Sequence, residues 1–166
     1  EMLGMEWTEE LSFQKMYLLM RHLDQMNHLQ GNGRIRLQVF RNENGYYTPQ
    51  TNSVSFLIEA EALEKKEYQL NEVGLKLDFF EDVRRQADKF SIIKTSNSLP
   101  FILAGNYKKK HALDDCIILN NENHVAESIS SNVFIVHKNE VITPSVDQGC
   151  IGGIMRQVII ALMHEQ

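Results

Sequence analysis

Residues 125–134 read Val125-Ala126-Glu127-Ser128-Ile129-Ser130-Ser131-Asn132-Val133-Phe134. This stretch places one carboxylate, Glu127, at the end of a short apolar run and follows it with three serines. A carboxylate there can hold a protonated ring nitrogen, and serine hydroxyls can donate hydrogen bonds to a phosphate or brace the turn. Loops with a glutamate and several serines are also common in purely structural turns, so this stretch alone is weak evidence for a binding site.

A second stretch, Ile93-Lys94-Thr95-Ser96-Asn97, places a lysine between an apolar segment and a polar turn. The apolar residues predict a short, buried extended segment over 90–93. A lysine at the end of a buried strand loses part of its hydration, which disfavours its charged form. A neutral amine is the form that makes a Schiff base with a carbonyl cofactor. Spacing alone nevertheless favours the simpler interpretation, in which Lys94 reaches water at the end of a strand.

The third stretch is Gly152-Gly153-Ile154-Met155-Arg156, at the start of a predicted helix. Glycines let a ligand approach the backbone closely, and the free N–H groups of a helix N-terminus attract anions such as phosphate. The dinucleotide pattern G-x-G-x-x-G and the P-loop pattern are both absent from the sequence. Local evidence alone favours a glycine-rich turn into a helix.

Composition excludes several classes of protein. The chain has 166 residues, with 17 basic against 22 acidic side chains and a net charge of −5, so it lacks the basic excess of a nucleic-acid binder. Its apolar runs are too short to span a bilayer, and its two cysteines are typical of a reduced, intracellular chain. The six histidines show no metal-ligand spacing. We expect a soluble, cytoplasmic protein with no metal site and no nucleic-acid or membrane partner.

Periodicity predicts one helix and a hairpin in the first part of the chain. The charged stretch Glu64-Lys65-Lys66-Glu67 has no apolar period and indicates a linker, so the first domain is predicted to cover residues 1–66. Tyr46 and Tyr47 follow the hairpin turn, where they can reach a neighbouring cleft or simply pack. The predicted elements are a helix over 9–29 with Thr8 as its N-cap, strands over 34–41 and 53–60, a turn at 42–45 and a linker over 61–68.

Short strands with a helix on either side are predicted in the second part, which forms a second domain over 67–166. The chain begins with Glu1 rather than methionine and stops within a helical pattern. We therefore expect it to be an internal piece of a longer protein, with both domains incomplete. The predicted elements are strands over 73–80, 116–120, 125–127, 132–137 and 140–142, a polar segment over 81–89, a helix over 99–111 and a closing helix that starts near Gly153.

Taken together and in order, these stretches resemble the class IV, fold-type IV aminotransferases, a family of pyridoxal-phosphate enzymes. The family includes branched-chain and D-amino acid aminotransferases and aminodeoxychorismate lyase. The resemblance is strong over 92–162, is fainter over the first sixty residues, and also rests on Ile142-Thr143-Pro144. It implies an α+β, two-domain D-amino acid aminotransferase-like fold, in which a small α/β domain and a larger pseudo-barrel α/β domain hold the cofactor between them. It also implies a homodimer.

The resemblance assigns roles to individual residues. Lys94 matches the lysine that binds pyridoxal 5'-phosphate as a Schiff base and then moves a proton between the substrate carbon and the cofactor. Glu127 matches the carboxylate on the pyridine nitrogen, which keeps the ring an electron sink. The other residues implied at the site are Ser130 and Ser131 near the cofactor, the backbone N–H groups of Ile154 and Met155 on the phosphate, and Tyr46 and Tyr47 as candidate contacts to the substrate.

Some positions depart from the pattern of many members. Asn97-Ser98-Leu99 stands where a tyrosine often faces the cofactor, Met155 replaces a threonine, and the hairpin lacks an arginine that binds the substrate carboxylate. Residues 153–157 look more like the lyase branch. The leading prediction is an aminotransferase that acts on an amino acid and a 2-oxo acid. The alternatives are 4-amino-4-deoxychorismate lyase, which gives 4-aminobenzoate and pyruvate, and a homologue without catalytic activity.

Overall fold

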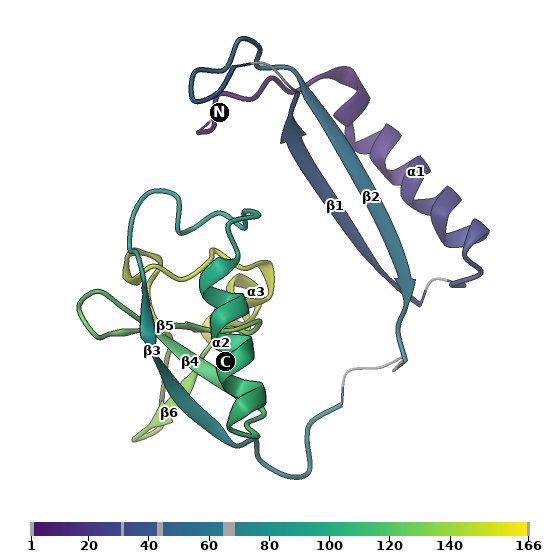
Figure 1. The fold of residues 1–166 in the computed structure, drawn as a ribbon. Helices are drawn as coiled ribbons and strands as arrows, with labels where there is room; N and C mark the ends of the chain where they lie inside the picture. Colours follow the sequence, from purple (N-terminus) through teal and green to yellow (C-terminus); the bar gives the residue numbers. More distant parts are fainter. Residues whose placement is uncertain (1, 31, 43–44, 65–68, 166) are drawn as a thin grey trace. The chain divides into compact units, whose positions relative to one another are not determined.

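A computed structural model of the chain describes residues 2–30, 32–42, 45–64 and 69–165 (Figure 1). The chain divides into two compact units, Glu1–Leu70 and Asn71–Gln166. The predicted domain boundary, between residues 66 and 67, lies outside the described residues. The predicted turn at 42–45 and the predicted linker also include residues that the structure does not describe.

The first unit is a two-stranded antiparallel sheet with one helix packed along it (Figure 1). Strands β1 and β2 pair in continuous register, from Gly33 opposite Ala62 to Arg41 opposite Val54. The predicted hairpin is therefore confirmed, and β2 runs two residues past its predicted end into the expected linker. The elements are a short 3-10 helix η1 (Glu9–Leu11), α1 (Phe13–Met26), β1 (Gly33–Arg41) and β2 (Val54–Ala62).

The helix predicted over 9–29 is wrong at both ends. Ser12 has an extended backbone with ψ of 145°, and it separates η1 from α1. At the other end, His28 has φ of 54°, in the left-handed region that an α-helix of L-residues does not continue through. Leu29 keeps the helical spacing in the sequence, but it is buried beside β1 as part of the connection. Thr8 precedes η1 and makes no side-chain capping bond.

The second unit contains a three-stranded sheet in the order β3-β4-β5 and a separate two-stranded sheet of β6 and β7. Strands β3 and β4 are parallel, and β4 and β5 are antiparallel. Helix α2 joins β3 to β4 and packs against both (Figure 1). The elements are β3 (Leu77–Arg85), α2 (Leu99–Lys110), β4 (Asp115–Asn120), β5 (Val125–Ser128), β6 (Ile135–His137), β7 (Glu140–Ile142), a 3-10 helix η2 (Val146–Gln148) and α3 (Ile154–His164).

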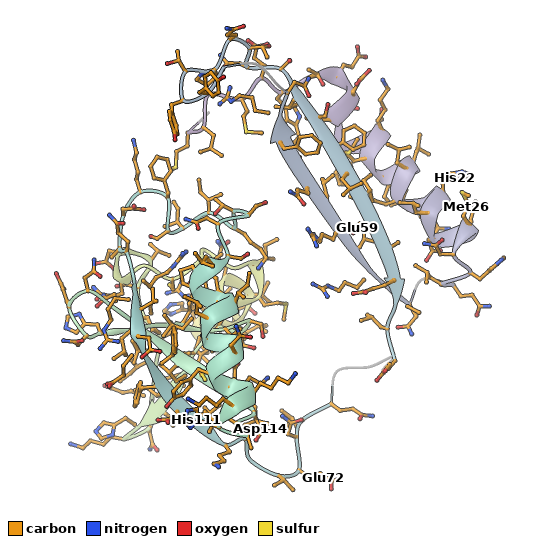
Figure 2. The ribbon with its side chains drawn as sticks, viewed as in Figure 1. His22, Met26, Glu59, Glu72, His111 and Asp114 are labelled. Atoms are coloured by element: carbon orange, nitrogen blue, oxygen red, sulfur yellow. The ribbon has the colours of Figure 1, made fainter. Side chains whose placement is uncertain are left out.

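The core of the second unit lies between α2 and the sheet, where Phe80, Ala104, Cys116 and Ile118 are buried. Past the end of α2, near His111, the Asp114 carboxylate accepts the Lys76 N–H at 2.7 Å (Figure 2). The Asp114 N–H donates in turn to the Lys76 carbonyl at 2.9 Å. These two bonds hold the starts of β3 and β4 side by side, which sets their parallel register.

Phe80 gives a direct test of this core because its neighbour Phe79 offers a matched control. Phe80 is 1% exposed and Phe79 is 49% exposed. We expect Phe80→Ala to lower the free energy of unfolding by about 3–5 kcal/mol, because it leaves a cavity between α2 and the sheet. Phe79→Ala is expected to cost about 1 kcal/mol or less. Urea unfolding of the two variants checks the difference, and equal losses would contradict this description of the core.

Strand β3 is displaced from its predicted position. It starts at Leu77 rather than at residue 73 and continues to Arg85, into the segment over 81–89 that was predicted only as polar. The first pairing with β4 joins Leu77 to Asp115, so the ladder begins only there. As an edge strand, β3 tolerates the exposed charged side chains of its second half.

The extended segment predicted over 90–93 is a turn instead. The Asp88 carboxylate accepts the N–H groups of Phe90 at 2.8 Å and of Ser91 at 3.1 Å, which is the geometry by which aspartate initiates a turn. Ile92 is 39% exposed, so the apolar pair Ile92-Ile93 does not form a buried strand. A short apolar run cannot distinguish these structures by itself.

Helices α2 and α3 confirm the predicted helix over 99–111, with Pro100 in its first turn, and the predicted closing helix. The strand predicted over 132–137 is shorter, since β6 starts at Ile135. The Val133 carbonyl accepts a hydrogen bond from the Thr143 hydroxyl at 2.8 Å instead of pairing in a ladder. No helix in the described part of the chain is long and apolar enough to cross a membrane.

Candidate active site

A cavity of about 310 Å³ in the second unit brings together the three stretches singled out in the sequence. Lys94 lies in the connection before α2, Glu127 lies in β5, and Gly153 is the residue that precedes α3. This volume lies in the range typical of small-molecule sites. The remaining lining residues are Arg85, Ile93, Thr95, Asn97, Ser98, Phe101, Ser128, Ile129, Ser130, Ser131, Asn132 and Ile151.

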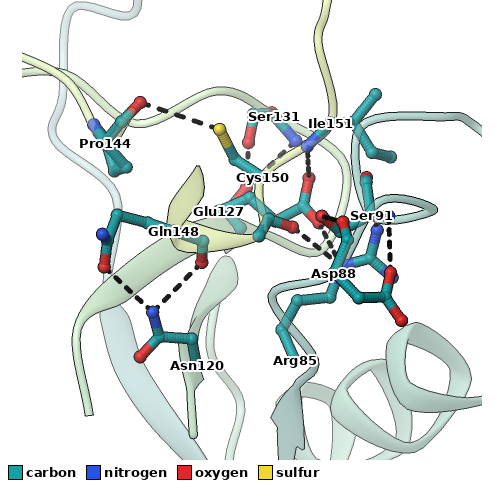
Figure 3. A network of polar contacts seen from close by, with 12 residues as sticks. Arg85, Asp88, Ser91, Asn120, Glu127, Ser131, Pro144, Gln148, Cys150 and Ile151 are labelled. Carbon is teal, nitrogen blue, oxygen red and sulfur yellow. Dashed lines mark hydrogen bonds and ion pairs between the residues drawn. The ribbon is translucent and has the colours of Figure 1, made fainter. Parts of the chain in front are cut away.

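Glu127 is the buried carboxylate of this cavity, with only 7% of the residue exposed. Its Oε2 accepts the Ile151 N–H at 3.3 Å, and its Oε1 lies 3.1 Å from Arg85 Nε (Figure 3). The Arg85 Nε–H, however, donates to the Gly149 carbonyl at 3.0 Å. Within the described residues, Oε1 therefore has an ion-pair neighbour but no hydrogen bond. A buried acceptor without a donor is an unsatisfied group that a ligand N–H can satisfy.

Burial raises the pKa of Glu127 above its ordinary value, because desolvation penalises the carboxylate. The Ile151 N–H and the charges of Arg85 and Lys94 act in the opposite direction. The charge on Glu127 therefore depends on positive groups around it. A ligand with a protonated nitrogen against Oε1 would supply a further one.

The raised pKa predicts how stability depends on pH. Because the folded state holds the Glu127 proton more tightly than the unfolded state, the free energy of unfolding falls as pH rises from about 4.5 through the folded-state pKa. Glu127→Gln lacks this decrease, so its stability relative to wild type should rise across that window and then level off. Chemical unfolding of the cofactor-free protein at several pH values checks this. Glu81→Gln, on the exposed part of β3, controls for loss of a carboxylate, and parallel profiles for both variants would contradict the prediction.

Lys94 lines the cavity and follows a turn that is held by hydrogen bonds. It is exposed and follows a turn, so the predicted position at the end of a buried strand is wrong. The Asp88 carboxylate holds the beginning of this turn, and the Gly152 N–H donates to the Ile92 carbonyl at 3.0 Å. The second bond ties the segment that carries Lys94 to the glycines before α3.

Ser130 and Ser131 lie in a tight turn that follows β5. The Ser128 N–H donates to the Ser131 carbonyl at 3.2 Å, and the Ser131 N–H donates to the Ser128 hydroxyl oxygen at 3.0 Å. Asp115 of β4 accepts the Ser128 hydroxyl at 2.9 Å. The hydroxyls of Ser130 and Ser131 line the cavity and have no hydrogen bond to any described residue. They remain available to a ligand.

The N-terminus of α3 adjoins the same cavity. Gly153 is its N-cap and gives no side-chain cap, and the N–H groups of Ile154 and Met155 find no acceptor in the described part of the chain. A Cβ atom at residue 153 would lie 3.0 Å from the Asn132 side-chain oxygen, so glycine is the residue that leaves this corner open. Free N–H groups at a helix N-terminus favour an anion such as phosphate.

Not every sequence-based candidate is a lining residue: Ile154 and Met155 are not among the residues that line the cavity, whereas Arg85 lines it without having been indicated by the sequence. Tyr46 and Tyr47 belong to the first unit, are fully exposed, and are not among the lining residues. Arg85 falls in the segment predicted as polar, and no spacing in the sequence connects it to Glu127. Within the described residues, no group of three or more His, Cys, Asp or Glu side chains can hold a metal ion.

Comparison with known proteins decides the family. A family model described as amino-transferase class IV matches residues 1–166. The chain belongs to the class IV aminotransferase family. The resemblance noted in the sequence is therefore confirmed.

The fold expected of a class IV aminotransferase is confirmed by solved structures. One is a protein from Legionella pneumophila assigned as a 4-amino-4-deoxychorismate lyase, with a TM-score of 0.84 and 22% identity over 99% of this chain and 59% of that chain. Another is an aminotransferase from Brucella abortus bound to the cofactor PLP, with a TM-score of 0.72 and 23% identity over 98% of this chain and 57% of that chain. At these identities the likeness concerns the fold.

Sequence relatives include a "Probable branched-chain-amino-acid aminotransferase" of Aquifex aeolicus (strain VF5). It is 36% identical over 53 residues, which make up 32% of this chain and 17% of the relative. The chain thus matches only a part of its relatives, and it spans a little over half of the two solved structures.

Proposed function

We propose that the full-length protein is a pyridoxal 5'-phosphate-dependent aminotransferase that moves an amino group between an amino acid and a 2-oxo acid. One observation carries the proposal: a single cavity is lined by a lysine, by a buried carboxylate whose Oε1 has no hydrogen-bond donor, and by two serines whose hydroxyls have no partner, all counted among the residues that the structure describes. These are the groups that this cofactor needs at its aldehyde, ring nitrogen and phosphate. Membership of the class IV aminotransferase family supports the same activity.

The donors and acceptors present fit the cofactor. Glu127 Oε1 would accept the N–H of the protonated ring nitrogen. The hydroxyls of the lining residues Ser130 and Ser131 would hold the phosphate. The N–H groups of Ile154 and Met155, which follow the lining residue Gly153, would add two donors. When bound, pyridoxal phosphate supplies an aldehyde that condenses with amines and a ring that accepts the electrons of a broken bond.

The residues of this chain would supply binding and proton transfer. Lys94 Nζ would join the cofactor and, once displaced by the substrate amine, carry a proton to and from the substrate carbon. Glu127 would hold the ring nitrogen in its charged form, which makes the ring a stronger electron sink. The serine turn, braced by Asp115, would fix the phosphate end so that the aldehyde stays within reach of Lys94.

The direct test is to supply the full-length protein with pyridoxal phosphate, an amino acid and 2-oxoglutarate, and to measure glutamate formation over a panel of L- and D-amino acids. We expect glutamate to accumulate with at least one donor and to require both the cofactor and the 2-oxo acid. Absence of glutamate with every donor, in a protein that binds the cofactor, would contradict the aminotransferase proposal.

The second candidate function is a lyase that cleaves 4-amino-4-deoxychorismate to 4-aminobenzoate and pyruvate. It is favoured by the likeness of residues 153–157 to the lyase branch and by the fold shared with the Legionella pneumophila protein. Both reactions use a base at Lys94, and they differ in whether the substrate carbanion is reprotonated or expels a leaving group. Release of pyruvate from 4-amino-4-deoxychorismate without any 2-oxo acid would establish the lyase.

We also propose that the full-length protein acts as a homodimer, as the resemblance to the family implies. Sedimentation equilibrium would check this directly. A mass of one chain at micromolar concentration would contradict it.

A further inference from the structure

We propose that Arg85 is the positioning residue of the cofactor site, which aims the Glu127 carboxylate and at the same time ties together the segments that carry Lys94 and the head of α3. This inference rests on the proposed function for the ligand concerned. The contacts of Arg85 with Glu127, Gly149 and Ser91 lie within this chain, so their effect on Glu127 can be tested without the cofactor.

Arg85 ends β3, and its guanidinium has a different neighbour on each side. Its Nε–H donates to the Gly149 carbonyl at 3.0 Å, and its Nη2–H donates to the Ser91 carbonyl at 2.9 Å. Glu127 Oε1 lies 3.1 Å from Nε (Figure 3). The guanidinium carbon lies 5.3 Å from the centre of the Phe101 ring in α2. One planar side chain therefore contacts residues of four different segments.

The two carbonyl contacts lead to proposed functional groups. Ser91 belongs to the turn that ends at Lys94, and the Gly149 carbonyl precedes Ile151, whose N–H binds Glu127 Oε2. Because the Nε–H donates to Gly149, Arg85 lies beside Oε1 and favours the charged form of Glu127 without a hydrogen bond to that oxygen. Oε1 is thus oriented by the arginine and open to a donor in the cavity.

The ion pair of Arg85 and Glu127 is shielded from water, which strengthens the interaction between the two charges. The side chains of Arg85 and Glu127 are only 14% and 9% exposed, so solvent screens their interaction far less than it does for surface pairs. The charged and titratable groups that act on Glu127, or on which it acts, are Arg85, Lys94 and the Cys150 thiol. Of the two cations, Arg85 has a side chain that is only 14% exposed and is held by backbone carbonyls, whereas Lys94 is exposed.

The neighbouring arginine supplies a matched control. Arg84 donates to the Asn123 side chain at 3.2 Å and to the Glu81 carbonyl at 2.8 Å, and it does not line the cavity. Arg84→Gln therefore removes an equal charge one residue away without touching Glu127. Arg85→Gln removes the whole arrangement, whereas Arg85→Lys keeps the charge but cannot reach the Gly149 and Ser91 carbonyls with a fork of donors.

Two measurements on the full-length protein test the proposal. The first follows the ¹³C signal of the Glu127 side-chain carboxyl against pH in cofactor-free protein, assigned with Glu127→Gln. We expect Arg85→Gln to move the titration midpoint upward by about one pH unit or more, since one unit corresponds to a tenfold change in the proton equilibrium. Arg85→Lys should restore much of that shift, and Arg84→Gln should match wild type.

The second measurement is the dissociation constant of pyridoxal phosphate, from equilibrium dialysis. We expect Arg85→Gln to weaken binding by about tenfold or more, as removal of a buried charge partner does. Arg85→Lys is expected to weaken it by at least about threefold, because a lysine lacks the planar fork of donors. If Arg85→Gln fails to fold, Arg85→Lys decides the question, and an affinity equal to wild type overturns the proposal.

Identical midpoints and affinities for Arg85→Gln and Arg84→Gln would also overturn the proposal. If the site does not take pyridoxal phosphate at all, the result is different, since wild type itself would then not bind the cofactor. The carboxyl titration would still report on the Arg85–Glu127 pair in that case, and an unshifted midpoint in Arg85→Gln would refute it.

Discussion

Replacing Lys94 with alanine is expected to reduce turnover by about a thousandfold or more, because the variant loses both the covalent link to the cofactor and the proton carrier. Lys94 is the single lysine among the residues that line the cavity, so no neighbouring amine in the described part of the chain can substitute for it. Steady-state rates with saturating cofactor check the result, whichever of the two reactions the enzyme catalyses.

Lys89→Ala is the matched control for this variant. Lys89 lies five residues earlier, with its amine 4.9 Å from the centre of the Phe90 ring, and it is not a lining residue. Its removal should leave the rate within about twofold, as expected of a surface change. A Lys94→Ala enzyme that turns over at the wild-type rate would refute both the aminotransferase and the lyase proposals.

Glu127→Gln is expected to separate catalysis from cofactor binding. The amide can still make a hydrogen bond at the ring nitrogen, but it carries no negative charge to keep that nitrogen protonated. Turnover should therefore fall by about a hundredfold or more, while the affinity for pyridoxal phosphate falls by about tenfold or less. Rates at saturating cofactor and dissociation constants from dialysis provide the two values.

Glu122→Gln controls for the loss of a carboxylate elsewhere. Glu122 is exposed, and its partner is His124 at 3.6 Å. Neither turnover nor cofactor affinity should change in this variant. Equal losses of turnover and affinity in Glu127→Gln would argue against a charge-based role for that residue, since a purely structural defect affects both.

The sequence predicted those parts of the fold whose signals are local. The alternating residues of β1 and the glycines before α3 specify their elements through backbone geometry and periodicity, and the structure confirms both elements. The prediction of an extended segment over 90–93 was wrong because two adjacent isoleucines are compatible with either a strand or a turn. The Asp88 carboxylate stabilises the turn through two hydrogen bonds. Such competition between a side chain and a ladder is not visible in an apolar pattern.

In the candidate site, too, the residues with a local sequence signal were predicted and those that depend on tertiary contacts were not. Glu127, Ser130 and Ser131 occur in one recognisable stretch, and the structure places all three on one cavity together with Lys94. Arg85 could not be found in this way, because its importance comes from contacts with Gly149 and Ser91, which depend on the pairing of β3 with β4. Long-range contacts of this kind follow from tertiary packing and carry no local signature.

The most direct test of the central claim is the visible absorption spectrum of the full-length protein with added pyridoxal phosphate, recorded for wild type and Lys94→Ala, before and after L-glutamate. The proposed function predicts a yellow band in wild type that is missing from Lys94→Ala and that bleaches when an amino donor converts the cofactor to its amine form. A stable band that glutamate leaves unchanged would favour the lyase or another donor. No band in wild type would contradict the claim that Lys94 binds the cofactor, and the proposed function would fall with it.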